Sequence, residues 1–360
     1  MKSRKTASRN SKTPANKTKK LPVKPHAVIK PAAKPAKTGK AAARKTPARL
    51  LQAGEPAPYR IENAKGSAPV LIVCDHASNR VPQILDNVGL SKADLQKHIA
   101  WDPGTENIGQ YMSEKLDAAA FFANYSRIVV DVNRGERSPE CMRDVSDHIQ
   151  VPGNKNLSAA QKRQRLDEIF WPYHHALSAQ IKTYLKKGIV PMIVSLHSFT
   201  PEMDGYKRPW EIGVLWNKEE TIARSLIDNL RAQNPGMVVG ENEPYTLKQA
   251  NLSKNTIKTH AEDTGLPYVI VEFRQDLVAT KRDALKWGRL FIEALAPILL
   301  DEGVYRPRRE RERTQPVSKK PAAKKTAKTT AKKAVKKPVK KAAVKPAAKA
   351  AKKPLRRAGK

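Results

Sequence analysis

The chain has 360 residues, a formal net charge of +35 and a pI near 10.2. The charge is uneven, because residues 1–50 carry +16 and residues 306–360 carry +21, which leaves residues 51–305 at about −2. No run of 18 apolar residues is present, and the first residues lack an apolar stretch, so we expect neither a membrane span nor a secretory signal. Two cysteines are too few for a disulfide framework and fit a reducing compartment.

Both ends of the chain alternate lysine, alanine and proline and contain almost no aromatic or large aliphatic side chains. Such segments cannot bury enough apolar surface to offset a backbone entropy loss of roughly 1–2 kcal/mol per residue. We therefore expect two disordered basic tails, residues 1–50 and 306–360, on either side of one folded domain, residues 51–305. A domain of that size can bury a substantial core.

Strand-like and helical patterns alternate along the predicted domain. An apolar run that opens residues 69–82 predicts a buried parallel strand that leads into a polar loop. The elements expected next, in chain order, are a helix over 105–120, a strand over 127–134, a helix over 158–187, strands over 189–199 and 211–216, helices over 218–232 and 254–264, a strand over 268–276 and a helix over 277–299. This alternation predicts an α/β fold: a single three-layer domain with helices on both faces of a mostly parallel central sheet.

Polar residues follow four of the predicted buried strands. They are Asp75 and His76, Asn133 and Arg134, His197 and Ser198, and Glu272 and Arg274. Because the carboxyl ends of parallel strands share one edge of a sheet, we expect these residues to converge on one pocket. Two imidazoles can bind Zn²⁺, which lowers the pKa of its water to roughly 7, and a nearby carboxylate can accept the proton. An arginine at the same edge can bind a substrate carboxylate through its bidentate guanidinium group.

A family resemblance rests on six motifs in their expected order. They are VCDHASNRVP at 73–82, WDPGTENIG at 101–109, SRIVVDVNR at 126–134, WPYHHAL at 171–177, IVSLHSF at 193–199 and YVIVEFRQDL at 268–277. On these motifs the chain resembles the N-formylglutamate amidohydrolase family over nearly all of residues 60–300. The resemblance implies metal-dependent hydrolysis of the amide bond in N-formylglutamate or a similar N-acyl amino acid, which is then the expected small-molecule partner.

That family is related to the zinc carboxypeptidases and aspartoacylases, so the resemblance also implies a zinc-carboxypeptidase-like fold. LHSF resembles the strand whose histidine binds zinc, which implies that role for His197 beside His76. DVNR resembles the motif that holds a substrate carboxylate, which implies that role for Asn133 and Arg134. The strand-end general base corresponds by resemblance to Glu272. The implied cofactor is Zn²⁺ or another divalent metal.

One motif departs from the His-x-x-Glu pattern of the carboxypeptidases. Asn79 stands at the third position after His76, and an amide is a poor zinc ligand. We expect Asp102 to replace it as the third metal ligand, with Asn79 orienting the substrate or the metal-bound water. An equally good interpretation makes Asp102 the cap of the helix that starts near Thr105.

Two further arginine candidates each have two interpretations. Arg127 binds the substrate, or it pairs with Asp131 or another acid. Arg274 completes an anion site, or it braces Glu272 through an ion pair, which is the interpretation we favour.

The remaining candidates lie on a helix and next to strand ends. His174 and His175 are expected to be one packed and one solvated, although the family resemblance favours a pocket role for His174. Cys74 lies inside an apolar strand, which indicates an inert core thiol. Ser198 lacks a G-x-S-x-G motif, so a serine hydrolase is disfavoured.

The basic tails suggest a function of a different class. Their Lys/Ala/Pro composition is similar to the tails of linker histones, and long cationic segments bind nucleic acid with little sequence preference. The alternative to the amidohydrolase is therefore a nucleic-acid-associated protein that acts through these tails, with a catalytically silent core. The departure at Asn79 is the best support for the loss of catalysis alone. A plainer interpretation of the tails is a solvated segment that binds any polyanion, anionic lipid included, without a dedicated role. We expect a cytoplasmic protein that can associate with the nucleoid through its tails.

Overall fold

The computed structural model describes residues 49–247 and 254–306. The predicted basic tails, 1–50 and 306–360, lie outside the described residues except at their inner ends. None of the described helices combines the length and the apolar character needed to cross a membrane.

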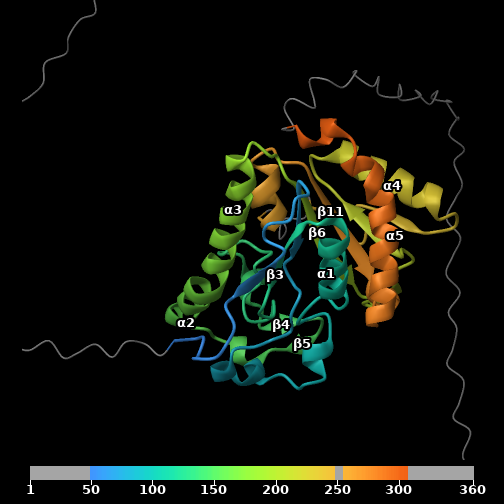
Figure 1. Ribbon diagram of the computed structural model, residues 1–360. Coiled ribbons are helices and arrows are strands. Elements are labelled where there is room, and N and C mark those ends of the chain that lie inside the picture. The colour runs from blue at the N-terminus through green and yellow to red at the C-terminus, as the bar shows by residue number, and fades with distance from the viewer. Residues whose placement is uncertain (1–48, 248–253, 307–360) are drawn as a thin grey trace, which may run out of the picture. The chain divides into compact units, whose positions relative to one another are not determined.

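A sheet of seven strands forms the centre of the domain, with the order β1-β3-β2-β6-β11-β9-β10 (Figure 1). Its strands are β1 (Tyr59–Glu62), β2 (Val70–Cys74), β3 (Ala119–Ala123), β6 (Met192–Phe199), β9 (Ile212–Leu215), β10 (Val239–Glu241) and β11 (Tyr268–Arg274). The inner strands β3, β2, β6 and β11 run parallel to one another, whereas β1 is antiparallel to β3 and β9 is antiparallel to β11. The predicted α/β fold with a mostly parallel sheet is confirmed.

Helices cover both faces of this sheet (Figure 1). On one face, α1 (Thr105–Leu116), α4 (Glu220–Gln233) and α5 (Lys281–Leu299) pack in one apolar cluster with alternate strand residues such as Ile72 and Leu196. On the other, α3 (Trp171–Lys186) packs with the intervening residues such as Leu71 and Ile193. Because the inner strands are buried on both sides, they read as continuous apolar runs in the sequence.

Shorter elements connect these layers. They are the helices α2 (Ala159–Arg165), η1 (Gln83–Gly89), η2 (Asp94–Gln96), η3 (Pro139–Met142), η4 (Pro152–Asn154), η5 (Leu166–Phe170), η7 (Lys258–Glu262), η8 (Gln275–Leu277) and η9 (Glu302–Tyr305), and the paired short strands β4 (Val145–Ser146) with β5 (Ile149–Gln150) and β7 (Glu202–Met203) with β8 (Tyr206–Lys207). The helix predicted over 158–187 is present as α2, η5 and α3 in succession.

The strand predicted over residues 127–134 is wrong. This segment forms turns, in which the amide of Val129 donates to the carbonyl of Ser126 and the amide of Arg134 donates to that of Asp131. Val129 and Val130 are buried in the core all the same. The apolar run therefore encodes burial, and its backbone hydrogen bonds are made locally instead of in the sheet.

The fourth inner strand is instead β3, whose first two residues were predicted to end the helix over 105–120. That helix, α1, ends at Leu116 because Asp117 adopts a left-handed conformation with φ of 48°. The Asp117 carboxylate accepts hydrogen bonds from Ser67 and Asn63, which holds the chain reversal in place. The helical period of the sequence thus continued past the true end of the helix.

Candidate active site

A cavity of about 220 Å³ opens at the carboxyl ends of the inner strands. Ser195 and His197 of β6 and Ile270 and Glu272 of β11 line it. They alternate with residues of the α1 side, such as Leu196, so the cavity lies on the α3 side of the sheet. This is the edge at which parallel α/β sheets bind ligands.

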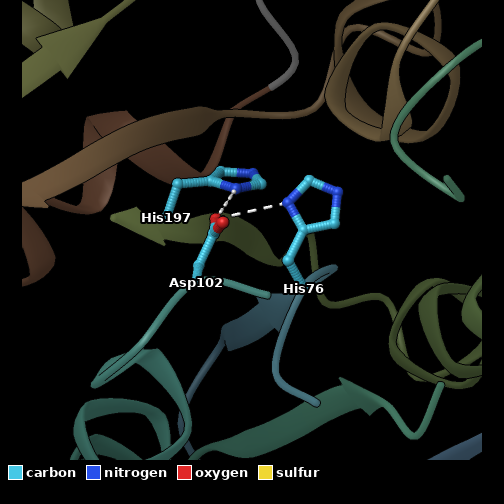
Figure 2. Close-up of side chains that lie close together, drawn as sticks. All are labelled: His76, Asp102 and His197. Carbon is cyan, nitrogen blue, oxygen red and sulfur yellow. Dashed lines mark hydrogen bonds and ion pairs between the residues drawn. The ribbon is translucent and has the colours of Figure 1, made fainter. Parts of the chain in front are cut away.

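His76, Asp102 and His197 meet in this cavity (Figure 2). The Asp102 Oδ2 atom lies 3.2 Å from His76 Nδ1 and 2.9 Å from His197 Nδ1. All three side chains are buried, and their possible ligand atoms lie within 4.8 Å of one another. The structure therefore brings together the three residues that the sequence suggested as metal ligands.

The second nitrogen of each imidazole faces an acid or an amide. His76 Nε2 lies 2.8 Å from Asp131 Oδ1. His197 Nε2 lies 3.3 Å from the Asn133 side-chain amide and 3.7 Å from Asp75 Oδ2, a distance too long for a hydrogen bond. Histidines that bind metals typically engage a carboxylate or carbonyl through their second nitrogen, which fixes the ring orientation.

Asp75 is completely enclosed behind His197. Its Oδ1 accepts hydrogen bonds from Tyr173 Oη at 2.6 Å and Thr256 Oγ1 at 2.9 Å. Its Oδ2 is buried and has no hydrogen-bond partner among the described residues. Burial lowers the pKa of His197, but the hydrogen bond to Asp102 and the nearby Asp75 carboxylate outweigh it and raise that pKa to about 10.

Asp102 does not cap α1, so that interpretation is wrong. Gly104 occupies the cap position without a side-chain hydrogen bond, and only the backbone carbonyl of Asp102 contacts the Thr105 amide and hydroxyl. The carboxylate points to the imidazoles, and its Oδ1 lies 3.3 Å from Arg127 Nη1. Arg127 also binds Asp131 through Nε at 3.2 Å and Nη2 at 2.9 Å.

Arg127 therefore pairs with two buried acids and also lines the cavity. Burial alone would raise the pKa of the Asp102 and Asp131 carboxyls, but the imidazoles and Arg127 hold both well below their usual range. Both acids are consequently ionised at neutral pH. The pairing that the sequence suggested for Arg127 is observed, and it extends to a second acid.

Glu272 has a contrasting environment. It pairs in register with His197 on the neighbouring strand, yet its Oε2 is buried without a hydrogen-bond partner among the described residues. Burial raises the pKa of Glu272 from its ordinary value of 4.5 to about 7, against the opposing effect of His197. A carboxyl group with a pKa near neutrality and an unengaged oxygen is suited to accept and return a proton.

Asn133 and Arg134 reach the cavity from the turn that replaces the predicted strand. The Asn133 Oδ1 accepts a hydrogen bond from the Thr256 amide at 3.0 Å, which turns its Nδ2 toward His197. Arg134 donates from Nη1 to the Asn133 carbonyl at 2.9 Å, while its Nε is buried without a partner in the described structure. Arg134 thus has a buried donor available to a ligand.

Asn79 and Arg274 do not line the cavity. The Asn79 side-chain amide donates to the Leu95 carbonyl at 2.9 Å and so holds the loop after β2. Arg274 pairs with Asp276 at 2.8 Å, and the described residues show no ion pair between Arg274 and Glu272. The expected bracing of Glu272 is therefore absent from the described structure.

His174 is packed behind the cavity and His175 is exposed, which is the ordinary arrangement expected for such a pair. His174 Nε2 lies 3.0 Å from the Val132 carbonyl, and its Nδ1 lies 2.8 Å from His260 Nε2. His174 therefore supports the turn that presents Asn133, without lining the cavity itself.

Burial raises the pKa of the Cys74 thiol, which fits a core residue.

Sequence reasoning missed several residues around the site. His98 lies 3.5 Å from Asp102 Oδ1, and Asp131 contacts His76 across 55 positions of sequence. Arg143 and Tyr245 also line the cavity. Asp131 could have been found from its suggested pairing with Arg127, but His98, Arg143 and Tyr245 carried no signal.

A cavity with imidazoles, buried carboxylates and arginines at the carboxyl edge of a parallel sheet is typical of α/β enzymes that hydrolyse polar bonds. The model of the N-formylglutamate amidohydrolase family matches residues 68–279. The chain belongs to this family of amidohydrolases.

Solved structures add two comparisons. The gene product Atu2144 from Agrobacterium tumefaciens is 32% identical, with a TM-score of 0.65 over 69% of this chain and 99% of that one. An N-formylglutamate amidohydrolase from Ralstonia eutropha JMP134 is 16% identical, with a TM-score of 0.49 over 67% of this chain and 97% of that one. A search of curated proteins finds no significant match.

Proposed function

We propose that the domain is a metal-dependent amidohydrolase that cleaves N-formylglutamate or a similar N-acyl amino acid. Membership of the amidohydrolase family supports cleavage of an amide. The proposed metal dependence rests on one observation: three buried side chains bring His76 Nδ1, His197 Nδ1 and Asp102 Oδ2 close together.

These residues fit a zinc-type site. Two imidazole nitrogens and one carboxylate oxygen form a donor set that leaves a fourth position for water or substrate. Ligand atoms about 2.0–2.1 Å from a tetrahedral ion lie roughly 3.3 Å apart, close to the observed separations of 2.9 and 3.2 Å. A divalent ion held by His76, Asp102 and His197 would polarise the acyl carbonyl and lower the pKa of water to roughly 7.

Glu272 is the general base in this proposal. It accepts a proton from the attacking water and returns it to the departing amine as the carbon–nitrogen bond breaks and the new carbon–oxygen bond forms. The products are a carboxylic acid and a free amine, which ionise to a carboxylate and an ammonium group at neutral pH. Its position beside His197 in the sheet register and its oxygen without a hydrogen-bond partner among the described residues support this role.

Arg134 and Asn133 bind the substrate carboxylate. The Nε of Arg134, which has no partner in the part of the chain that the structure describes, can donate to a carboxylate oxygen. The Thr256 contact fixes the Asn133 amide beside His197. Arg127 is a positioning residue, because its guanidinium group is engaged by Asp102 and Asp131.

The test combines metal analysis with a substrate screen on the full-length protein. We expect stoichiometric metal and hydrolysis of N-formyl or N-acetyl amino acids. Glu272→Gln should lower kcat by about 100-fold or more without loss of metal. His175→Ala, at an exposed histidine, is the matched control and should change neither. Joint loss of metal and activity in Glu272→Gln would make Glu272 a ligand, and an inactive, metal-free parent would favour a silent core.

The tails support a separate proposal, which rests on their charge. Segments that carry +16 and +21 can displace many counterions from DNA or RNA. Full-length protein should bind duplex DNA with an affinity that falls steeply with salt, and deletion of residues 1–50 and 306–360 should abolish binding. Binding that survives the deletion would contradict it.

A further inference from the structure

Buried polar side-chain atoms without a hydrogen-bond partner are few in the described ranges, and they gather at one place. They are Asp75 Oδ2, Arg134 Nε, Ser195 Oγ and Glu272 Oε2. All but the first belong to residues that line the cavity. Because an unpaired buried polar group is costly, such a cluster indicates a site that receives matching atoms from a ligand. Ser195 is the member that the proposed function leaves without a role.

The sheet register places Ser195 directly below the reacting centre. On β6, Ser195 lies two residues before His197 and therefore on the same face of the sheet. Ser195 pairs with Ile270, and Ile270 pairs with Leu215, whereas His197 pairs with Glu272. Ser195, Ile270 and Leu215 are thus cross-strand neighbours and form one row, as His197 and Glu272 form another. The row of Ser195 lies roughly 7 Å from the row of His197, toward the amino ends of β6 and β11.

This lower row is apolar except for one hydroxyl group. Ile270 and Leu215 belong to the same packed core cluster as Ile128 and Ile257, which also line the cavity. The cationic side chains of the cavity come from other segments, namely Arg127, Arg134, Arg143, His76, His98 and, in the upper row, His197. A charged group placed beside Ser195 would lack a counter-ion in its row and would be expensive to bury.

We propose that Ser195, Ile270 and Leu215 form a subsite for an uncharged, mostly apolar substituent of the substrate that carries one hydrogen-bonding atom near its end. The inference deepens the proposed function, since it assumes that the scissile amide lies at the row of His197 and Glu272. A chain of roughly four to six atoms with bonds near 1.5 Å spans the distance between the rows. The substituent is either the acyl chain or the amino-acid side chain, and a formyl group alone leaves the subsite empty.

Binding measured by calorimetry tests the subsite separately from turnover. Full-length Glu272→Gln protein is titrated with N-acylglycines from formyl to hexanoyl, and with N-formyl derivatives of glycine, norvaline and norleucine. Affinity should rise about fourfold per added methylene in one of the two series, which identifies the substituent. A terminal carboxylate on the longest chain should reverse the gain. Flat affinity in both series, or equal binding of the carboxylate-ended chain, would overturn the subsite.

Two variants connect the effect to this row. Ser195→Ala should remove the roughly 2- to 10-fold advantage of a terminal hydroxyl or amide on the ligand, and Ile270→Phe should abolish the chain-length dependence by filling the space. Ser113→Ala is the matched control, because Ser113 is a buried serine of α1 outside the cavity whose Oγ donates to the Ala118 carbonyl. Length dependence that persists in Ile270→Phe would place the substituent elsewhere.

The outcomes also separate this inference from the proposed function. Graded affinity without hydrolysis of any N-acyl amino acid by the parent protein would retain the subsite and remove the amidohydrolase proposal. Hydrolysis of N-formyl amino acids with flat affinity would retain the amidohydrolase and remove the subsite.

Discussion

Two groups of histidine and aspartate side chains in the described structure satisfy the same distance requirement for a metal ion and differ in their surroundings. The buried group is His76, Asp102 and His197, and the exposed group is Asp147, His148 and Asp204. The closest contacts are alike, at 2.9 Å between His197 and Asp102 and 2.9 Å between His148 and Asp204. The exposed group lies at the tips of two short hairpins, β4–β5 and β7–β8.

The difference lies in the next layer of contacts. In the buried group, His76 engages Asp131 through its second nitrogen, and Arg127 holds the second oxygen of Asp102. In the exposed group, water competes for every contact and screens the charges, so the side chains are free to separate. Equal distances therefore do not make equal sites, because a metal site also needs partners that hold its ligands in place.

Removal of one carboxylate from each group should give the largest difference in metal affinity and turnover between the two groups. Asp102→Asn should weaken metal binding by more than about 100-fold and abolish turnover, because even changes to outer contacts of a metal site cost about 10- to 100-fold. Asp204→Asn should leave both unchanged. Competition against a chelator measures the affinities. Comparable losses in the two variants would show that the exposed group also binds the ion.

Arg127→Met tests whether the surrounding charges matter to stability. It leaves Asp102 and Asp131 buried without the guanidinium group that pairs with both, and with only the imidazoles beside them. This should cost about 3–5 kcal/mol of unfolding free energy in urea titrations. Arg224→Met is the control, because the partners of Arg224, Glu220 and Glu241, are at the surface, and it should cost less than about 1 kcal/mol. A loss below 1 kcal/mol for Arg127→Met would mean that these acids are solvated or neutral.

Glu272 should make the stability of the metal-free protein depend on pH. Its pKa is raised from 4.5 to about 7 in the folded state, so the buried carboxylate destabilises the fold as the pH rises above 4.5, with the full effect above about 7. The cost is on the order of 3 kcal/mol. In chelated protein, Glu272→Gln should therefore raise Tm at pH 8 and leave it nearly unchanged at pH 4. Equal shifts at both pH values would point to packing instead of charge.

The exposed pair of His148 and Asp204 should have the smallest effect on the stability of the fold. Hydrogen bonding to Asp204 raises the pKa of His148, so any stabilisation is complete below the unfolded pKa of 6.5 and is lost as the pH rises through the folded value. Because both side chains are exposed, His148→Gln should give no change in Tm that calorimetry resolves between pH 5 and pH 8. A resolvable shift that disappears above the folded pKa would show a stronger contact between the hairpins.

The sequence predicted those features that depend on apolar pattern and chain position. The strands that deliver His76, His197 and Glu272 were found because buried parallel strands are continuous apolar runs. The segment 127–134 has the same pattern but forms turns, because burial alone does not decide where a backbone finds its hydrogen-bond partners. It delivers Asn133 and Arg134 to the cavity nonetheless.

Side-chain direction could not be predicted from strand-end position. Asn79 and Arg274 stand where polar residues of the site were expected, but the Leu95 carbonyl and Asp276 engage them locally. The pairing of His76 with Asp131 joins distant segments, so no local pattern reveals it. Ser195 shares a face with His197 by simple alternation, but only the structure shows that its hydroxyl has no partner among the described residues.

The most direct test is a crystal structure of the full-length protein grown with zinc, with anomalous diffraction recorded at the zinc edge. We expect one strong peak within about 2.0–2.2 Å of His76 Nδ1, His197 Nδ1 and an Asp102 oxygen. A peak confined to Asp204 and its hairpin neighbours, or imidazoles of His76 and His197 that share no ion, would contradict the proposed metal centre.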